Sequence, residues 1–168
     1  MRILGIDPGY AIVGWGVIRY QAGTPSPLGF GALTTGADLP FEERLRVIYQ
    51  DLDVVLDRYR PDVMAIEQLF FHTNQKTAIA VAQARGVLVL AATLRGIPVF
   101  EYTPLQVKQS VVGYGKAVKS QVMEMTRTLL RLEQVPRPDD TADALAIAIC
   151  HAHSYNSRLT ETAGRRIK

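Results

Sequence analysis

The first nine residues constrain the fold of this chain most, because a short apolar run there ends abruptly in a carboxylate and a turn. Ile3, Leu4 and Ile6 form the run, and Asp7 is followed by Pro8-Gly9. An apolar run without polar alternation predicts a strand buried on both faces, typical of the centre of an α/β sheet. Asp7 would then lie at the carboxyl end of a central strand, where open α/β sheets bind ligands. Asp-Pro-Gly is also a common turn composition, so Asp7 alone has a purely structural explanation.

The rest of the pattern predicts an α/β fold with a mixed five-stranded sheet flanked by helices. The predicted strands cover the run at Ile3–Ile6 and residues 11–20, 28–35, 63–66 and 97–102, with a turn at 21–27. The predicted helices cover 41–59, 77–94, 104–112, a stretch around 122–130 and one that begins near Pro138. The length suits a single domain. We expect that domain to span residues 1–156, with residues 157–168 as a flexible basic tail.

A second carboxylate follows the predicted strand at 63–66, since Glu67 comes directly after Ile66. A strand–helix–strand order favours parallel pairing with the first strand. Parallel neighbours end at the same edge of a sheet, so this pairing would bring Asp7 and Glu67 together there.

Two more acids, Asp140 and Asp143, lie three residues apart at the start of the last predicted helix and would share one face. Helix N-termini favour Asp, which explains Asp139 or Asp140 without any function, but Asp143 less well. Each like-charged pair about 4 Å apart costs roughly 4 kcal/mol at an effective dielectric near 20. Four converging acids therefore require a cation, and neutralising Asp143 should raise the melting temperature of the metal-free protein.

Oxygen-only ligands suit Mg²⁺ or Mn²⁺ rather than zinc. Two such ions about 3.5–4 Å apart stabilise both the attacking and the leaving oxygen of a phosphoryl displacement. The acids therefore indicate a two-metal phosphoryl-transfer site, provided that the predicted strand order is right.

Charge and cysteine content set looser bounds on the protein's class. The formal net charge is +3, which permits an anionic partner without requiring one. The one cysteine, Cys150, excludes an internal disulfide and fits a reducing, cytoplasmic setting. We expect no signal peptide, and no apolar stretch long enough to span a membrane.

Five motifs together resemble the RuvC family of Holliday junction resolvases, in the same order and over nearly the whole chain. They are Gly5-Ile6-Asp7-Pro8-Gly9, Ile66-Glu67-Gln68, Val107-Lys108-Gln109 with Val111-Val112-Gly113, Lys119-Ser120-Gln121-Val122, and Asp140-Thr141-Ala142-Asp143-Ala144-Leu145-Ala146. The first motif alone is weak, because actin-like ATPases begin similarly. The resemblance implies an RNase H-like fold, and a homodimer that resolves four-way DNA junctions by paired symmetric nicks in recombination and repair. It also implies Mg²⁺, with Mn²⁺ as a substitute, and the branch-migration proteins RuvA and RuvB as partners.

By position, the family's catalytic metal ligands correspond to Asp7, Glu67, Asp140 and Asp143. Spacing alone leaves Asp139 open as a ligand, and the family pattern selects Asp140. The resemblance also implies DNA contacts by Lys108 and Lys119, with Lys116 between them, and by the ring of Phe70 at the junction centre. The alternatives are surface lysines and a core phenylalanine.

Three other functions are alternatives to junction resolution. Another RNase H-like nuclease would act on RNA or on RNA–DNA hybrids. Cleavage assays that compare these substrates with a four-way junction would distinguish it from a junction resolvase. A non-catalytic junction-binding scaffold is disfavoured because all four acids are present. An actin-like ATPase would need a much longer chain and a second phosphate loop.

Overall fold

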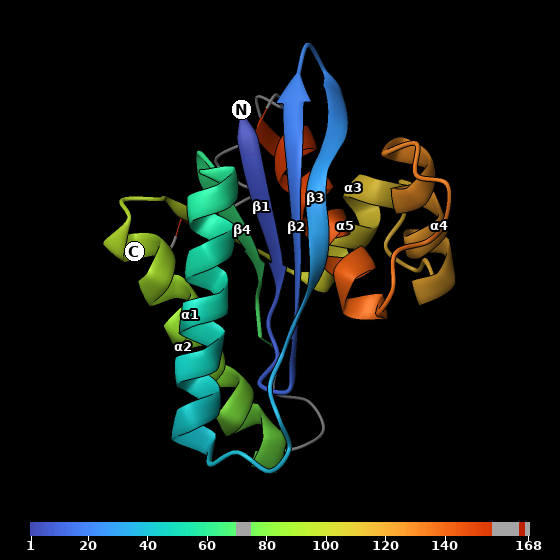
Figure 1. Ribbon diagram of the computed structural model, residues 1–168. Coiled ribbons are helices and arrows are strands. Elements are labelled where there is room, and N and C mark those ends of the chain that lie inside the picture. The colour runs from blue at the N-terminus through green and yellow to red at the C-terminus, as the bar shows by residue number, and fades with distance from the viewer. Residues whose placement is uncertain (70–74, 156–164, 167–168) are drawn as a thin grey trace.

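The computed structural model describes residues 1–69, 75–155 and 165–166. Helices cover both faces of a central sheet (Figure 1). The strands are β1 (Arg2–Asp7), β2 (Ile12–Gln21), β3 (Thr24–Thr34), β4 (Val63–Glu67), β5 (Val99–Tyr102) and β6 (Arg165–Arg166). The helices are α1 (Phe41–Tyr59), α2 (Gln75–Leu94), α3 (Pro104–Val112), α4 (Lys119–Leu129) and α5 (Asp139–Tyr155).

The central sheet has the mixed pairing that the sequence predicts. Its strand order is β3-β2-β1-β4-β5, and the two-residue β6 pairs with the outer edge of β5. β1, β4 and β5 run parallel, whereas β2 and β3 form an antiparallel meander on β1. The register aligns Ile6 with Ile66, so that Asp7 and Glu67 end neighbouring strands at one edge. The prediction of a mixed five-stranded sheet flanked by helices is confirmed.

Alternate residues of β1 face two different helical layers. Leu4 and Ile6 belong to the core under α1 and α2, whereas Ile3 belongs to the core under α3, α4 and α5. The side chains of a strand alternate with period two. Gly5 and Asp7 therefore lie on the same face as Ile3, toward α5.

Helix α5 lies directly on the sheet because glycines leave room for its backbone. A Cβ at Gly5 would stand 2.0 Å from the carbonyl oxygen of Ala144, and one at Gly14 would stand 1.9 Å from that of Asp140. Gly14 is also the residue that pairs with Asp7 in the register of β1 and β2. The first turn of α5 is thus held against the end of β1 that carries Asp7.

The predicted turn at 21–27 is wrong, because β3 begins at Thr24. Ala22 and Gly23 alone make the turn, with φ of 51° and 80°, and both angles match a two-residue hairpin. Pro25 and Pro27 are accommodated because β3 is an edge strand, where a missing N–H costs no ladder bond.

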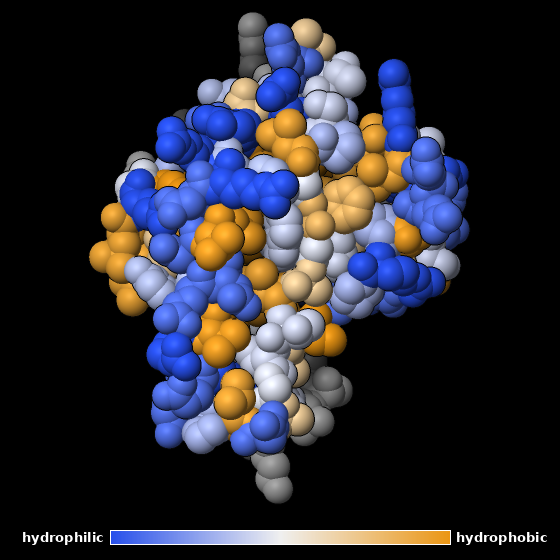
Figure 2. All heavy atoms as spheres, viewed as in Figure 1, coloured by the Kyte–Doolittle hydropathy of each residue, from blue (hydrophilic) through white to orange (hydrophobic). Residues whose placement is uncertain are grey.

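Helix α2 is more apolar than the sequence analysis expected. One stretch in the described residues, Thr77–Leu94, is long and apolar enough to cross a bilayer by length and composition alone. Its inner face joins the core through Ala84, Leu88, Ala91 and Ala92. Its outer face exposes Ile79, Leu90 and Leu94. The helix is therefore packed on the sheet and leaves an apolar surface uncovered, visible at the left of Figure 2.

Candidate active site

The alternation of β4 matches that of β1 and directs Glu67 to the same side as Asp7. Val63 and Ala65 belong to the core under α5, whereas Met64 and Ile66 belong to the core under α1 and α2. Glu67 follows Ala65 by two residues, so its side chain lies on the same face of the strand as those of Val63 and Ala65. Both strand-end carboxylates therefore face α5.

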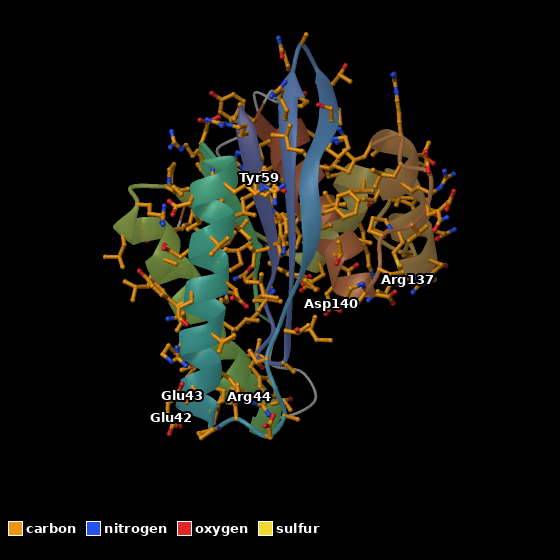
Figure 3. All side chains as sticks on the ribbon, in the orientation of Figure 1. Glu42, Glu43, Arg44, Tyr59, Arg137 and Asp140 are labelled. Atoms are coloured by element: carbon orange, nitrogen blue, oxygen red, sulfur yellow. The ribbon has the colours of Figure 1, made fainter. Side chains whose placement is uncertain are left out.

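Helix α5 supplies the other two predicted acids from its first two turns. Asp140 begins the helix over Gly14, and Figure 3 shows it at this end of α5. The charges of Glu67, Asp143 and Asp140 all act on Asp7. The structure thus brings all four sequence-predicted acids together from three elements that are distant in the chain.

The pKa values of the clustered acids are shifted upward, which means that the metal-free cluster resists full ionisation. Burial, followed by the charges of Glu67, Asp143 and Asp140, raises the pKa of Asp7 to about 8. Burial and the charge of Asp143 raise the pKa of Glu67, although a hydrogen bond from Asp7 partly offsets them. The two carboxyl groups therefore lie close enough to influence each other's ionisation.

Lys119 is the cation that pairs directly with the cluster. Its ammonium lies 2.9 Å from an Asp143 carboxylate oxygen and 3.6 Å from one of Asp139. Burial raises the pKa of Asp143 against the opposing effect of Lys119. Burial is the largest single influence on the pKa of Lys119 and lowers it, but the hydrogen bond with Asp143 and the charges of Asp143, Asp139 and Asp7 together outweigh burial and raise the pKa. One ammonium therefore compensates only part of the acidic charge.

Asp139, which spacing alone could not separate from Asp140, lies in a different environment. Besides Lys119, it pairs with the guanidinium of Arg137. The acids whose charges raise the pKa of Asp7 include Asp140 but not Asp139. Asp139 is therefore held among cations at the rim, whereas Asp140 faces Asp7.

A cavity of about 250 Å³ opens beside the acids. Its polar lining comprises Glu67, Asp143, Lys108 and Lys119, and its apolar lining comprises Pro104, Val107, Val122 and Ile147. The Thr103 capping box fixes the start of α3, which carries Lys108. The charge of Lys108 lowers the pKa of Glu67, so this lysine also faces the acids. The exposed Lys116, between α3 and α4, is not part of the lining.

The donor chemistry of the site fits a divalent cation with oxygen ligands. Four carboxylates supply oxygen donors there, and burial together with the charges of the neighbouring acids raises the pKa of Asp7 to about 8. Within the described ranges, no three His, Cys, Asp or Glu side chains are already arranged around one ion position.

Two further residues bear on the site. Phe70 lies outside the residues that the structure describes. Arg85 was missed, although it is the one charged residue in the apolar stretch of α2. Its Nε donates to the backbone carbonyl of Glu67 at 3.3 Å. An isolated charge inside an apolar helix was the signal that could have found it.

Comparison with known proteins identifies the family. Residues 3–151 match the family model described as crossover junction endodeoxyribonuclease RuvC. A relative of that name from Alkaliphilus oremlandii is 57% identical over 156 residues, which cover 93% of this chain and 95% of the relative. The solved structure of Thermus thermophilus RuvC is 36% identical, with a TM-score of 0.88 over 99% of this chain and 100% of that one. Its complex with a Holliday junction substrate gives a TM-score of 0.91 at the same identity, covering 99% of both chains.

These matches confirm the RNase H-like class of the sheet and the resemblance that the motifs suggested. They cover the segments that carry all four acids and the three lysines. The chain belongs to the RuvC family of crossover junction endodeoxyribonucleases.

Proposed function

We propose that Asp7, Glu67, Asp140 and Asp143 hold two divalent ions, Mg²⁺ or Mn²⁺, with which this endonuclease resolves four-way DNA junctions. The observation that carries the proposal is the placement of four acids from β1, β4 and α5 at one end of the sheet, where burial and then the charges of Glu67, Asp143 and Asp140 raise the pKa of Asp7 to about 8. Asp7 is central to the cluster, because the charges of all three other acids act on it. It is the residue that we assign to bridge both ions.

Bound divalent ions supply an activated water and a Lewis acid for the leaving oxygen. The chain's own residues position the DNA strand for that chemistry. Lys108 and Lys119 line the cavity beside Glu67 and Asp143, where each ammonium can neutralise a phosphate oxygen. Lys116 would contact the backbone beyond the cavity. Hydrolysis would leave a 3′-hydroxyl and a 5′-phosphate.

A homodimer supplies the two cuts that resolution needs, because the described part of one chain holds a single set of the four proposed catalytic acids. The exposed apolar side chains of α2 offer a surface for a two-fold contact, in which the same patch meets itself. Two active sites related by a two-fold axis match the symmetry of a four-way junction. The family further implies partnership with RuvA and RuvB. The DNA substrate and the single free thiol of Cys150 support a cytoplasmic location.

Phe70, three residues after Glu67, is the ring that we assign to the junction centre. Unstacking a base step costs a few kcal/mol, and stacking a base on an aromatic ring recovers about 1–3 kcal/mol. Phe70→Ala should therefore lose most resolution of a fully paired junction. A junction with unpaired bases at its centre should regain part of the rate. Equal resolution of the paired junction by Phe70→Ala and wild type would show that the ring has no such role.

The deciding experiment maps nicks on a mobile four-way junction with Mg²⁺ and with EDTA. Linear duplex DNA and an RNA–DNA hybrid of matched sequence serve as competing substrates. Paired symmetric nicks on the junction, dependent on Mg²⁺, are the expected result. Preferred cleavage of the hybrid would favour another RNase H-like nuclease, and binding without nicking would favour a scaffold.

A further inference from the structure

The guanidinium of Arg85 connects three elements at the edge of the sheet beside the acids. Arg85 comes from α2, its Nε donates to the carbonyl oxygen of Glu67 at 3.3 Å, and its Nη2 pairs with the carboxylate of Glu101 on β5. The side chains of Arg85 and Glu101 are only 16% and 23% exposed. A charge pair this sheltered from water needs good geometry to be favourable, so the arrangement restricts where each partner can lie.

Glu67 needs such an anchor because β4 ends with it. Beyond Glu67 the ladder continues with one bond, from the N–H of Gln68 to the carbonyl of Tyr102 at 2.9 Å. A ligand at the last residue of a strand is less fixed than one inside it. A metal ligand must be held within about 0.5 Å of its productive position by its supporting shell.

We propose that Arg85 is a positioning residue, which holds the carboxylate of Glu67 in place by binding the carbonyl group of the same residue. The inference rests on the proposed role of Glu67 as a metal ligand. The guanidinium binds the backbone carbonyl of Glu67, and its charge is paired with Glu101. Arg85 therefore acts through backbone geometry rather than through its charge.

The anchor also connects the active site to the apolar helix. α2 carries Arg85 on its sheltered side and exposes Ile79, Leu90 and Leu94 elsewhere. A partner that packs on those side chains would fix the helix from which Arg85 reaches Glu67. Metal binding at the acids thus depends on a residue of the helix that offers the dimer surface.

Arg95 provides a matched control. It follows the last residue of the same helix and pairs with two carboxylates of α1, at 2.5 Å from Asp53 and 2.5 Å from Asp57. Arg85→Met and Arg95→Met each remove one guanidinium from the same helical segment. Arg85→Lys keeps the charge and the pairing with Glu101, but it lacks the planar fork that reaches both partners at once.

The experiment measures Mn²⁺ binding by electron paramagnetic resonance without DNA, and the Mg²⁺ concentration that gives half-maximal nicking. We expect Arg85→Met to need about tenfold more of either ion, as for other outer-shell partners of metal ligands. Arg85→Lys should lie between Arg85→Met and wild type. Arg95→Met should match wild type in both measurements, even if its melting temperature falls as far as that of Arg85→Met.

Metal requirements equal to wild type in folded Arg85→Met, or equal increases in Arg85→Met and Arg95→Met, would overturn the inference. The variant Glu67→Gln distinguishes failure of the positioning role of Arg85 from failure of the proposed function. If Glu67→Gln binds Mn²⁺ and nicks like wild type, the assignment of Glu67 as a ligand is wrong. If Glu67→Gln fails while both Arg85 variants behave like wild type, only the positioning role is wrong.

Discussion

Two carboxylate clusters among the described residues differ in how far cations pair with their members. Asp53 and Asp57 of α1 share the guanidinium of Arg95 on the protein surface. A hydrogen bond from Arg95 lowers the pKa of Asp57 below its ordinary value. At the end of the sheet, four acids meet with one directly paired ammonium, and burial raises the pKa of Asp7 to about 8.

We propose that the difference separates carboxylates that serve the fold from carboxylates that bind a metal ion. The Arg95 cluster needs no added ion, since Arg95 binds both of its exposed carboxylates and the charge of Arg60 also acts on Asp57. The cluster around Asp7 is held by backbone packing of α5 on glycines, despite the mutual repulsion of its members. A chain that keeps such an arrangement gains from it only when a cation binds.

The largest expected contrast between the two clusters is in cleavage. Asp7→Asn, Glu67→Gln, Asp140→Asn and Asp143→Asn should each abolish nicking of a junction while sparing binding. Metal ions stabilise the transition state by several kcal/mol, so the loss should be at least about a hundredfold. Asp53→Asn and Asp57→Asn should nick like wild type. The comparison breaks down if Asp7→Asn keeps near-normal nicking, or if Asp53→Asn loses it.

A smaller contrast is expected in stability without metal. The pKa of Asp7 is about 8 in the fold against an ordinary value of 3.8, so the folded state binds more protons between these values. The unfolding free energy contributed by Asp7 therefore falls as the pH rises from about 4 to 8, by about 1 kcal/mol per pH unit. Urea unfolding in EDTA at pH 5 and pH 8 measures this. Relative to wild type, Asp7→Asn should gain stability at the higher pH.

The same experiment includes a control from the balanced cluster. The pKa of Asp57 is lowered, so its stabilising contribution is complete above the ordinary value and is lost only in acid. Asp57→Asn should therefore show no gain over wild type between pH 5 and pH 8. A gain in Asp57→Asn as large as that in Asp7→Asn would remove the distinction between the clusters.

The smallest expected effect concerns the lysines that face the cavity. Each phosphate contact contributes about 0.9 to the slope of log K against log salt on duplex DNA. Lys108→Ala and Lys119→Ala should each flatten the slope of junction binding by about that amount. Arg46→Ala on α1, where Arg46 pairs with Glu43, is the control and should leave the slope unchanged. Unchanged slopes and unchanged nicking would make Lys108 and Lys119 ordinary surface residues.

Much of this site followed from patterns that local physics dictates. Unbroken apolar runs predicted the buried strands that end in Asp7 and Glu67, and the strand–helix–strand order predicted their parallel pairing. Pairings that depend on the whole fold were not predictable. The ion pair of Lys119 with Asp143 joins two different helices, and its loss would offset any gain from neutralising Asp143. Asp7→Asn is therefore a cleaner test of repulsion than the variant that the sequence suggested.

Other differences between the sequence predictions and the structure arise because tertiary packing determines which of two locally possible conformations or contacts forms. Prolines at 25 and 27 indicated a turn, but the hairpin places them on an edge strand that tolerates them. Arg85 carries no motif of its own, and its contact with the Glu67 carbonyl exists only because α2 packs beside the end of β4. Positioning residues of this kind are set by geometry rather than by spacing.

The most direct test of the account is the stabilisation of the folded protein by Mg²⁺ in the absence of DNA. Thermal unfolding of wild type, Asp7→Asn and Asp53→Asn is followed at pH 8 and constant ionic strength, with Mg²⁺ or EDTA. Saturating ion should raise the melting temperature of wild type and Asp53→Asn by roughly 5–10 °C, because the ion binds only the native state. Asp7→Asn should show little or no increase. An equal increase in wild type and Asp7→Asn would contradict the claim that the unbalanced acids hold the metal.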